Sequence, residues 1–225
     1  MVDNAVYGED GGDDDLSMTM ETYGEVKGGD LTPSAGGKSV NKEGRYHCMV
    51  VSVKKEKEKE LDKARTTVKD GQCPHMSPPS VKIVFQVLAG DHEDQNDLMV
   101  YHQMYLWKWD AETAQFRLRT GKELKMHLQV CRGLGLCSQA DVDAGVFAIN
   151  FKNAVHKTCV LEVRKDKFEK SDGSEGSSYK IPFGNVWQPD DEAVSDVPKD
   201  PEAMALYVQG KITGGGTVTT PQNLF

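Results

Sequence analysis

The stretch that decides the fold reads VKIVFQVLAG at residues 81–90 and, after the polar break DHEDQND, LMVYHQMYLWKWD at residues 98–110. Both apolar runs are rich in β-branched and aromatic residues, and the break between them is rich in Asp and Asn. Two such runs around one polar turn are typical of a β-hairpin. Two of the three Trp of the chain, Trp107 and Trp109, lie in the second run. The pattern predicts a central hairpin whose exposed face binds a flat or extended ligand.

The second run of this hairpin is apolar on both faces. By the two-residue period of a strand, one face carries the aromatic side chains Tyr101, Tyr105, Trp107 and Trp109. The opposite face carries the aliphatic side chains Val100, Met104 and Leu106. Only one face of a one-sided sheet is buried. The aromatic residues are therefore either core or an exposed binding platform, and the pattern leaves both readings open.

Further strands are expected on both sides of the hairpin. Residues 44–53, 145–155 and 157–164 are apolar, β-prone runs, and residues 179–187 read as an extended segment near an edge because of Pro182. The long charged stretch after the first strand contains KKEKEKELDK. Its alternating signs favour a solvated helix, with a phosphate-binding segment as the alternative.

A helix is expected over residues 122–132. Leu124, Leu128 and Cys131 recur at helical spacing, and Thr120 with Glu123 matches the capping-box pattern. Five strands with a helix between the third and the fourth are the arrangement of an OB-fold barrel. The fold class predicted is therefore mainly β, with an SH3-like or other small barrel as the main alternative.

The net charge of −8 over 225 residues is unevenly distributed. Residues 1–46 carry ten acidic and four basic side chains, residues 188–225 carry six and two, and residues 47–187 carry nineteen and twenty-one. Polar, acidic segments cannot bury enough apolar surface to fold. We therefore expect a disordered acidic arm at residues 1–43, an OB-fold domain at 44–187 and a flexible acidic tail at 188–225. A slightly basic domain suits a polyanionic ligand.

Several classes of function lack support in the sequence. The five Cys are odd in number, and Cys48, Cys131 and Cys159 lie in apolar runs, which indicates reduced core thiols in a cytosolic compartment. None of the Cys and His spacings matches a structural zinc site, and no catalytic motif is present. Neither a signal peptide nor a membrane-length apolar run is found. We expect a cytoplasmic protein without enzymatic activity, metal, cofactor or membrane contact.

Binding of single strands requires cations that track phosphates and aromatic rings that stack bases. An OB-fold places these on the face of strands two and three and on two of its loops. The basic and aromatic side chains at these places are Lys54, Lys55, Tyr101, Tyr105, Trp107, Trp109, Arg117, Arg119, Arg164, Lys165, Lys167 and Phe168. Lys165 and Lys167 are either plain loop charges or, beside Phe168, part of a stacking site.

Short motifs resemble those of a family of phage-associated OB-fold proteins. They are Gly44-Arg45-Tyr46, residues 85–90, Leu106-Trp107, residues 133–136 and Lys157-Thr158-Cys159. The resemblance spans residues 44–187 and implies sequence-independent binding of single-stranded DNA during replication or recombination, in the host cytoplasm for a phage-encoded protein. The chain departs from the pattern in its long loop after the first strand. It also departs in the position of its C-terminal acidic residues, which lie well before Phe225.

The acidic tails suggest two roles, competition with DNA for the groove or docking of other replication and recombination proteins. A second class of function is a protein-interaction or scaffold module that holds a peptide in the barrel groove. A positive face with exposed aromatic rings would favour DNA, and a neutral apolar groove would favour a peptide. The sequence is also compatible with a homo-oligomer.

Overall fold

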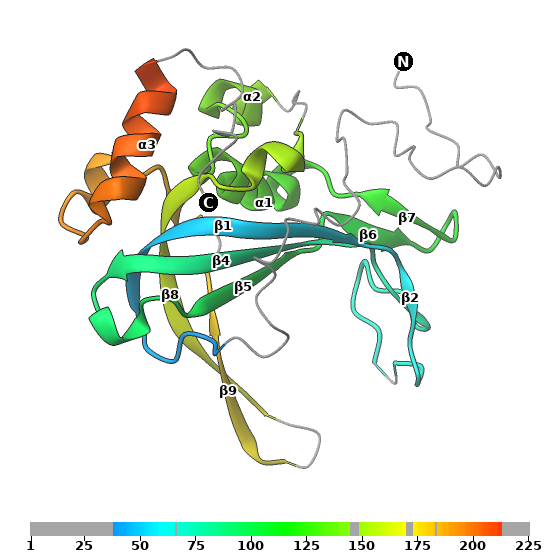
Figure 1. Cartoon of the computed structure of the whole chain (residues 1–225). Helices are drawn as coiled ribbons and strands as arrows, with labels where there is room; N and C mark the ends of the chain where they lie inside the picture. The colour runs from blue at the N-terminus through cyan, green and yellow to red at the C-terminus, as the bar shows by residue number, and fades with distance from the viewer. Residues whose placement is uncertain (1–37, 66, 145–148, 170–172, 183, 213–225) are drawn as a thin grey trace.

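The computed structural model describes residues 38–65, 67–144, 149–169, 173–182 and 184–212, and it is mainly β (Figure 1). The central antiparallel sheet has six strands. They are β1 (Gly44–Glu56), β4 (Ser80–Gly90), β5 (Met99–Met104), β8 (Thr158–Glu169), β9 (Glu175–Lys180) and β10 (Val186–Trp187). Two short ribbons pair β2 (Lys59–Glu60) with β3 (Met76–Ser77) and β6 (Trp107–Asp110) with β7 (Gln115–Leu118).

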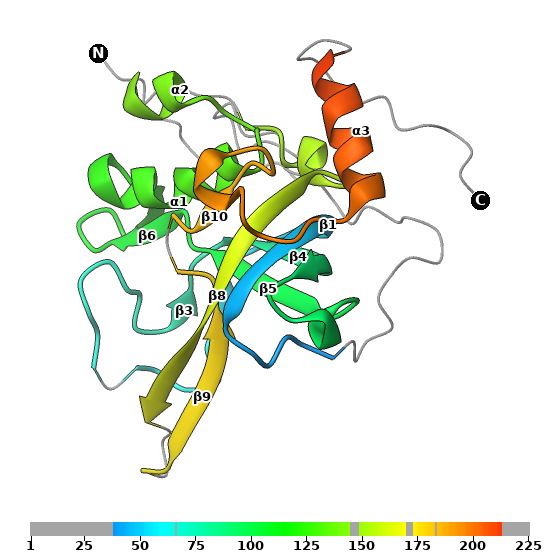
Figure 2. The same ribbon diagram turned by 90° about the vertical axis from the view of Figure 1, so that its left-hand side faces the viewer.

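The α-helices of the described residues are short and lie together on one side of the sheet, away from the tip of the β8–β9 hairpin (Figures 1 and 2). The α-helices are α1 (Gly121–Gly133), α2 (Gln139–Ala144) and α3 (Pro201–Ile212). Single 3₁₀ turns are η1 (Glu93–Gln95), η2 (Phe151–Ala154) and η3 (Glu192–Val194). None of the helices in the described ranges is long and apolar enough to cross a membrane.

The sheet contains a Greek key. Its strand order is β10-β8-β1-β4-β5, and β9 pairs with the distal part of β8. Three successive antiparallel strands, with a fourth returning by a long connection beside the first, define this motif. The long connection between β5 and β8 holds β6, β7, α1, α2 and η2. The prediction of a mainly β fold is confirmed, whereas the described strands do not hydrogen-bond into a closed barrel.

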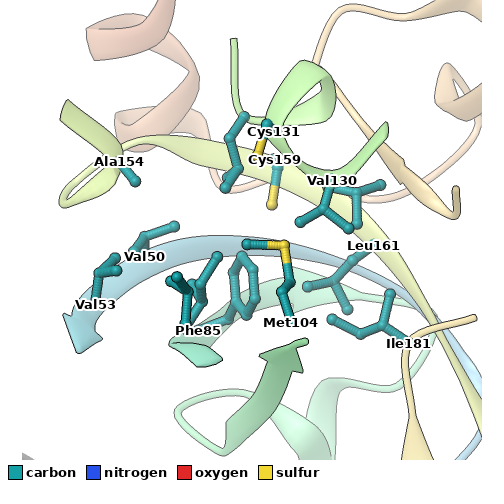
Figure 3. Close-up of a cluster of buried hydrophobic side chains, with 14 of the residues drawn as sticks. Val50, Val53, Phe85, Met104, Val130, Cys131, Ala154, Cys159, Leu161 and Ile181 are labelled. Atoms are coloured by element: carbon teal, nitrogen blue, oxygen red, sulfur yellow. The ribbon is translucent and has the colours of Figure 1, made fainter. Parts of the chain in front are cut away.

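The core lies between the concave face of the sheet and α1. Val50 and Phe85 are opposite each other in the β1–β4 register, and both are fully buried. Figure 3 shows these side chains with Met104 and Leu161 below Val130 and Cys131 of α1. Apolar burial of this kind is the main favourable contribution to folding. Helix α1 forms as expected, with Leu128, Val130 and Cys131 buried in the core, although the Thr120 side chain makes no capping hydrogen bond.

The strand predicted over residues 145–155 is wrong for the part described, because Phe151–Ala154 forms the 3₁₀ turn η2. The Asn150 side chain accepts a hydrogen bond from the Lys152 amide at 2.9 Å and begins the turn. Phe151 and Ala154, three residues apart, both point into the core. A short apolar run such as this one is compatible with a 3₁₀ turn as well as with a strand. Residues 145–148 lie outside the described ranges.

Two further expectations are corrected. Lys165 and Lys167 lie in a strand and not in a loop, since β8 continues to Glu169 and pairs with β9 in a hairpin. The alternating-sign stretch after the first strand is not helical, because β1 extends to Glu56 and residues 59–60 form β2. Ladder pairing with β4 and β3 stabilises these charged residues in extended conformation.

The prediction of a flexible tail from residue 188 onward is wrong for residues 188–212. The Arg45 guanidinium donates two hydrogen bonds to the Asp196 carboxylate, at 2.9 and 2.7 Å. Val194 and Val197 are buried against Val160 of β8. Two buried valines and the Arg45–Asp196 pair therefore hold this acidic segment against the domain. Residues 213–225 lie outside the described ranges.

The expected N-terminal arm falls mostly on residues 1–37, which lie outside the described ranges. Residues 38–43 belong to the domain. Val40 is buried, and its amide donates to the Met99 carbonyl at 3.1 Å, beside the edge of β5. The folded domain therefore begins before Gly44.

Candidate nucleic-acid interface

The side of β1, β4 and β5 that faces away from the core carries an ordered set of polar and aromatic side chains, which we call the outer face. Lys54 is opposite Lys82 in the β1–β4 register, and Lys82 is opposite Gln103 in the β4–β5 register. One step along the strands, Tyr101 is opposite Val84. Directly opposite residues of an antiparallel pair lie on the same face of the sheet.

The two tyrosines of the second hairpin arm are exposed. Tyr101 is 41% exposed and Tyr105 is 40% exposed, whereas Met104 and Leu106 are fully buried. The sequence allowed these two rings to be either core or exposed, and the structure shows them exposed. Tyr101 lies within β5, and Tyr105 follows directly after its last residue, Met104.

The two tryptophans of that arm have different environments. Strand β5 ends at Met104, and β6 begins at Trp107, so the alternation of faces does not continue through the arm. Trp107 is 5% exposed and belongs to the core. Trp109 is half-buried, with its ring centroid 5.1 Å from that of Phe116 in an edge-to-face contact. Trp107 is therefore not available as a stacking surface, in contrast to its expected role.

The positive charge of the outer face comes from two lysines. The Lys82 ammonium lies 5.5 Å from the centre of the Tyr101 ring, within the range of a cation–π contact. Lys54 is exposed on the neighbouring strand, and no ion pair involves it among the described residues. Lys55 is opposite Val81, so it lies on the other side of the sheet from Lys54.

The two arginines predicted beyond the hairpin arm are engaged by acidic side chains. The Arg117 Nε lies 2.9 Å from the Asp110 carboxylate. A hydrogen bond from Thr113 and the nearby Arg117 charge lower the pKa of Asp110. Arg119 donates through Nε to the Tyr105 carbonyl at 2.7 Å and through Nη1 to Glu123 at 3.0 Å. Arg119 thus holds the backbone of Tyr105 in place.

The remaining predicted residues lie on the β8–β9 hairpin, which projects from the sheet away from the helices (Figure 2). Arg164 pairs with Glu162, a contact that raises the pKa of the guanidinium. Lys165 and Lys167 share one face of the hairpin by strand alternation, and Phe168, 44% exposed, lies on the other. The structure therefore places this group on a projecting arm, apart from the outer face of β4 and β5.

Two residues of the outer face, Gln103 and Lys82, were missing from the sequence prediction. The Gln103 Nε2 donates to the Glu56 carboxylate at 3.0 Å and to the Ser80 hydroxyl at 2.8 Å. Lys82 also belongs to this face. The hairpin register, which pairs Lys82 with Gln103, would have identified both, but a sequence without a known turn geometry does not specify that register.

Within the described ranges, no cluster of three or more His, Cys, Asp or Glu is arranged to hold a metal ion. Comparison with protein-family models, with curated proteins and with solved structures finds no match to this chain.

Proposed function

We propose that this protein binds single-stranded DNA without strict dependence on sequence and acts in replication or recombination. The observation that carries the proposal is the outer face itself. It presents the exposed Tyr101 ring on β5, with the Lys82 ammonium beside this ring on β4 and Lys54 opposite Lys82 on β1, and the exposed Tyr105 ring follows directly after the end of β5. Rings beside cations are the combination that single-strand binding requires.

The chemistry of this face favours unpaired bases. A base stacked on Tyr101 or Tyr105 would contribute about 1–3 kcal/mol, whichever base it is. Paired bases within a duplex are already stacked and cannot cover these rings. Lysine ammonium groups bind phosphates as point charges without base discrimination. The outer face therefore supports binding of single strands over duplexes.

The topology supports the finer assignment of a partly open OB-fold. In the order β10-β8-β1-β4-β5, β9 pairs with β8 off this path, and β9 also contacts β5. Helix α1 lies between the third and fourth strands of this set. An OB-fold is a five-stranded, partly open Greek-key barrel that binds oligonucleotides on the face of strands two and three. In this assignment β4 and β5 are those strands. They carry Lys82 and Tyr101, and Tyr105 follows directly after β5.

The proposal extends to partners and location. The acidic segments at the two ends of the chain would compete with DNA or dock other replication and recombination proteins, in the cytoplasm of a host cell for a phage-encoded protein. Removing the acidic residues 1–37 would raise DNA affinity at low salt if they compete. Unchanged affinity would contradict competition.

The test is a fluorescence-anisotropy titration of labelled oligonucleotides of roughly 16 nucleotides with the full chain. Single strands and duplexes of the same length are compared at two salt concentrations. We expect tighter binding of the single strand and a steep loss of affinity at higher salt, because counterions are released on binding. Salt-insensitive binding, equal binding of duplexes, or no binding would contradict the proposal.

A further inference from the structure

Residues 188–200 connect β10 to α3 and pack on the sheet, and we call them the covering segment. Val194 and Val197 of this segment are buried against Val160 of β8. These three valines form a cluster of their own, separate from the main core. The covering segment therefore lies on a surface other than the one that packs on α1.

Strand alternation places this surface on the side of the sheet that faces away from the core. Val160 is opposite His47 in the β1–β8 register, and opposite residues share a face. The next residue of β1, Cys48, belongs to the core. Because neighbours along a strand alternate, His47 and Val160 face away from the core.

The same surface continues into the outer face. Met49 lies on the same side of β1 as His47, two residues further on, and is opposite Gln86 of β4. Gln86 in turn lies on the side of β4 that carries Lys82, four residues away. The covering segment and the pair of Lys82 and Tyr101 are therefore on one continuous side of the sheet.

The surface under the covering segment carries the groups that a single strand requires. Trp187, opposite Val160 in the ladder, is half-buried against the valine cluster. The Arg45 guanidinium donates to the Asp196 carboxylate at 2.9 and 2.7 Å. An aromatic ring can stack a base, and the fork of a guanidinium fits a phosphate as well as it fits a carboxylate. The valines and Asp196 thus occupy the places of a base and a phosphate.

The Arg45 fork has no second acidic partner at its outer nitrogens. Asp91 approaches only the Nε of Arg45, at 3.8 Å. Glu162, opposite Arg45 in the β1–β8 register, pairs with Arg164. The two Nη groups of Arg45 would therefore be open to a phosphate once Asp196 moves away.

Few contacts hold the covering segment in place. The Arg45 and Asp196 side chains are 33% and 66% exposed, and exposed ion pairs contribute little to stability. The Asp200 amide donates to the His47 Nδ1 at 3.1 Å, but the His47 Nε2 is buried without a hydrogen-bond partner among the described residues. A buried polar atom without a partner is destabilising. Local release of the segment is therefore easier than unfolding of the domain.

We infer that the surface under the covering segment is a second part of the DNA site, which a single strand reaches by displacing the segment. The inference rests on the proposed function, because it extends the site beyond Tyr101 and Tyr105. It differs from competition by free acidic chain, since the docked segment blocks the strand by occupying its surface. Long strands therefore gain from its release, and short strands do not.

The closing experiment compares labelled oligo-dT of about 4 and about 16 nucleotides, the limits of the site sizes known for OB-folds. Anisotropy titrations with the full chain give the ratio of the two affinities. The variant that carries both Val194→Ser and Val197→Ser lacks the buried contacts of the covering segment. It should bind the long strand about fivefold more tightly or better, through added stacking, and the short strand as the natural chain does.

A second variant tests the cover without removing the valines. Asp196→Asn should raise the affinity for the long strand about two- to fivefold, because the Arg45 fork is released from its ion pair. Glu192→Gln removes an equal charge from an exposed position of the covering segment and should leave the ratio unchanged. Val208→Ser, at an exposed position of α3, is the control for the valine variant. Circular dichroism checks that each variant is folded.

The outcomes separate the two proposals. Failure of the natural chain to bind either strand would overturn the proposed function and the covered site with it. Salt-sensitive binding by the natural chain, with the same ratio in the folded valine variant and in Asp196→Asn, would leave the proposed function intact and overturn the covered site. Equal gains for both lengths would also overturn it. Where the valine variant does not fold, Asp196→Asn against Glu192→Gln decides.

Discussion

The Lys82 ammonium lies 5.5 Å from the centre of the Tyr101 ring, on the side of the sheet that faces away from the core. This pair joins the two chemical requirements of single-strand binding in one place. The ring provides a stacking surface, and the ammonium provides a positive charge beside it. Because Lys54 is opposite Lys82 in the ladder, the charge extends across the neighbouring strand.

The outer-face lysines should determine the salt dependence of binding. Lys54→Gln and Lys82→Gln should each weaken binding to all sequences alike and reduce the slope of log K against log salt by about one. The measurement is a titration series over several salt concentrations. Lys211→Gln is the matched control, because Lys211 lies on α3 and pairs with Asp190. An unchanged slope for both outer-face variants would place the phosphates elsewhere.

Trp107 and Tyr101 should differ in their contributions to stability. Trp107 is 5% exposed within the core, so Trp107→Ala should lower the free energy of unfolding by about 3–5 kcal/mol. Tyr101 is 41% exposed, and Tyr101→Ala should cost less than about 1 kcal/mol. Urea denaturation of the two variants measures both values. Similar costs for the two substitutions would contradict the assigned faces of the hairpin arm.

Stability should fall at acid pH because three histidines are buried in the neutral form. Burial lowers the pKa values of His47, His102 and His127 to about 4, from 6.5. The His47 Nδ1 accepts a hydrogen bond from the Asp200 amide at 3.1 Å, which requires the neutral ring. The unfolded chain therefore binds more protons between pH 6.5 and 4, and the stabilisation present above pH 6.5 is lost as the pH falls toward 4.

Urea denaturation at several pH values between 4 and 7 measures this loss. His102→Leu should weaken the pH dependence, by of the order of 2 kcal/mol across this window. His75→Gln, at an exposed position before β3, is the control and should leave the dependence as it is. Equal pH dependence of His102→Leu and the natural chain would show that His102 is not buried in the neutral form.

Gly133 should be required for the contact between α1 and β10. A Cβ at this position would lie 2.3 Å from the Val186 carbonyl oxygen, which is far too close. Gly133→Ala should destabilise the protein by about 1–3 kcal/mol through overpacking, although alanine is the better helix former. Met126→Ala, at an exposed position of the same helix, serves as the control in thermal denaturation. A stabilising effect of Gly133→Ala would contradict the close approach of α1 to β10.

Local patterns predicted much of the fold. The two hairpin arms became β4 and β5, and the helical spacing of Leu128 and Cys131 gave α1. Where local pattern and tertiary context disagreed, tertiary context decided. Phe151 and Ala154 read as strand residues, yet Asn150 begins a 3₁₀ turn there. Residues 188–212 dock through Val194 and Val197 together with the Arg45–Asp196 hydrogen bonds.

The candidate site was predicted only in part, for a reason that the strands make clear. Tyr101 and Tyr105 could be placed on one face by strand alternation, but whether that face was core depended on the partner strands. The bend between β5 and β6 then separated Trp107 from these tyrosines. Gln103 and Lys82 are adjacent only through the register of the ladder, which the sequence does not specify.

The outer face is tested most directly by the variant that carries both Tyr101→Thr and Tyr105→Thr, titrated with a labelled single strand. Threonine keeps the strand propensity and removes the rings. We expect an affinity loss of tenfold or more, since each stacked base contributes about 1–3 kcal/mol. Leu206→Thr, which removes an exposed side chain of α3, should bind as the natural chain does. Unchanged affinity of the double variant, folded by circular dichroism, would contradict binding at this face.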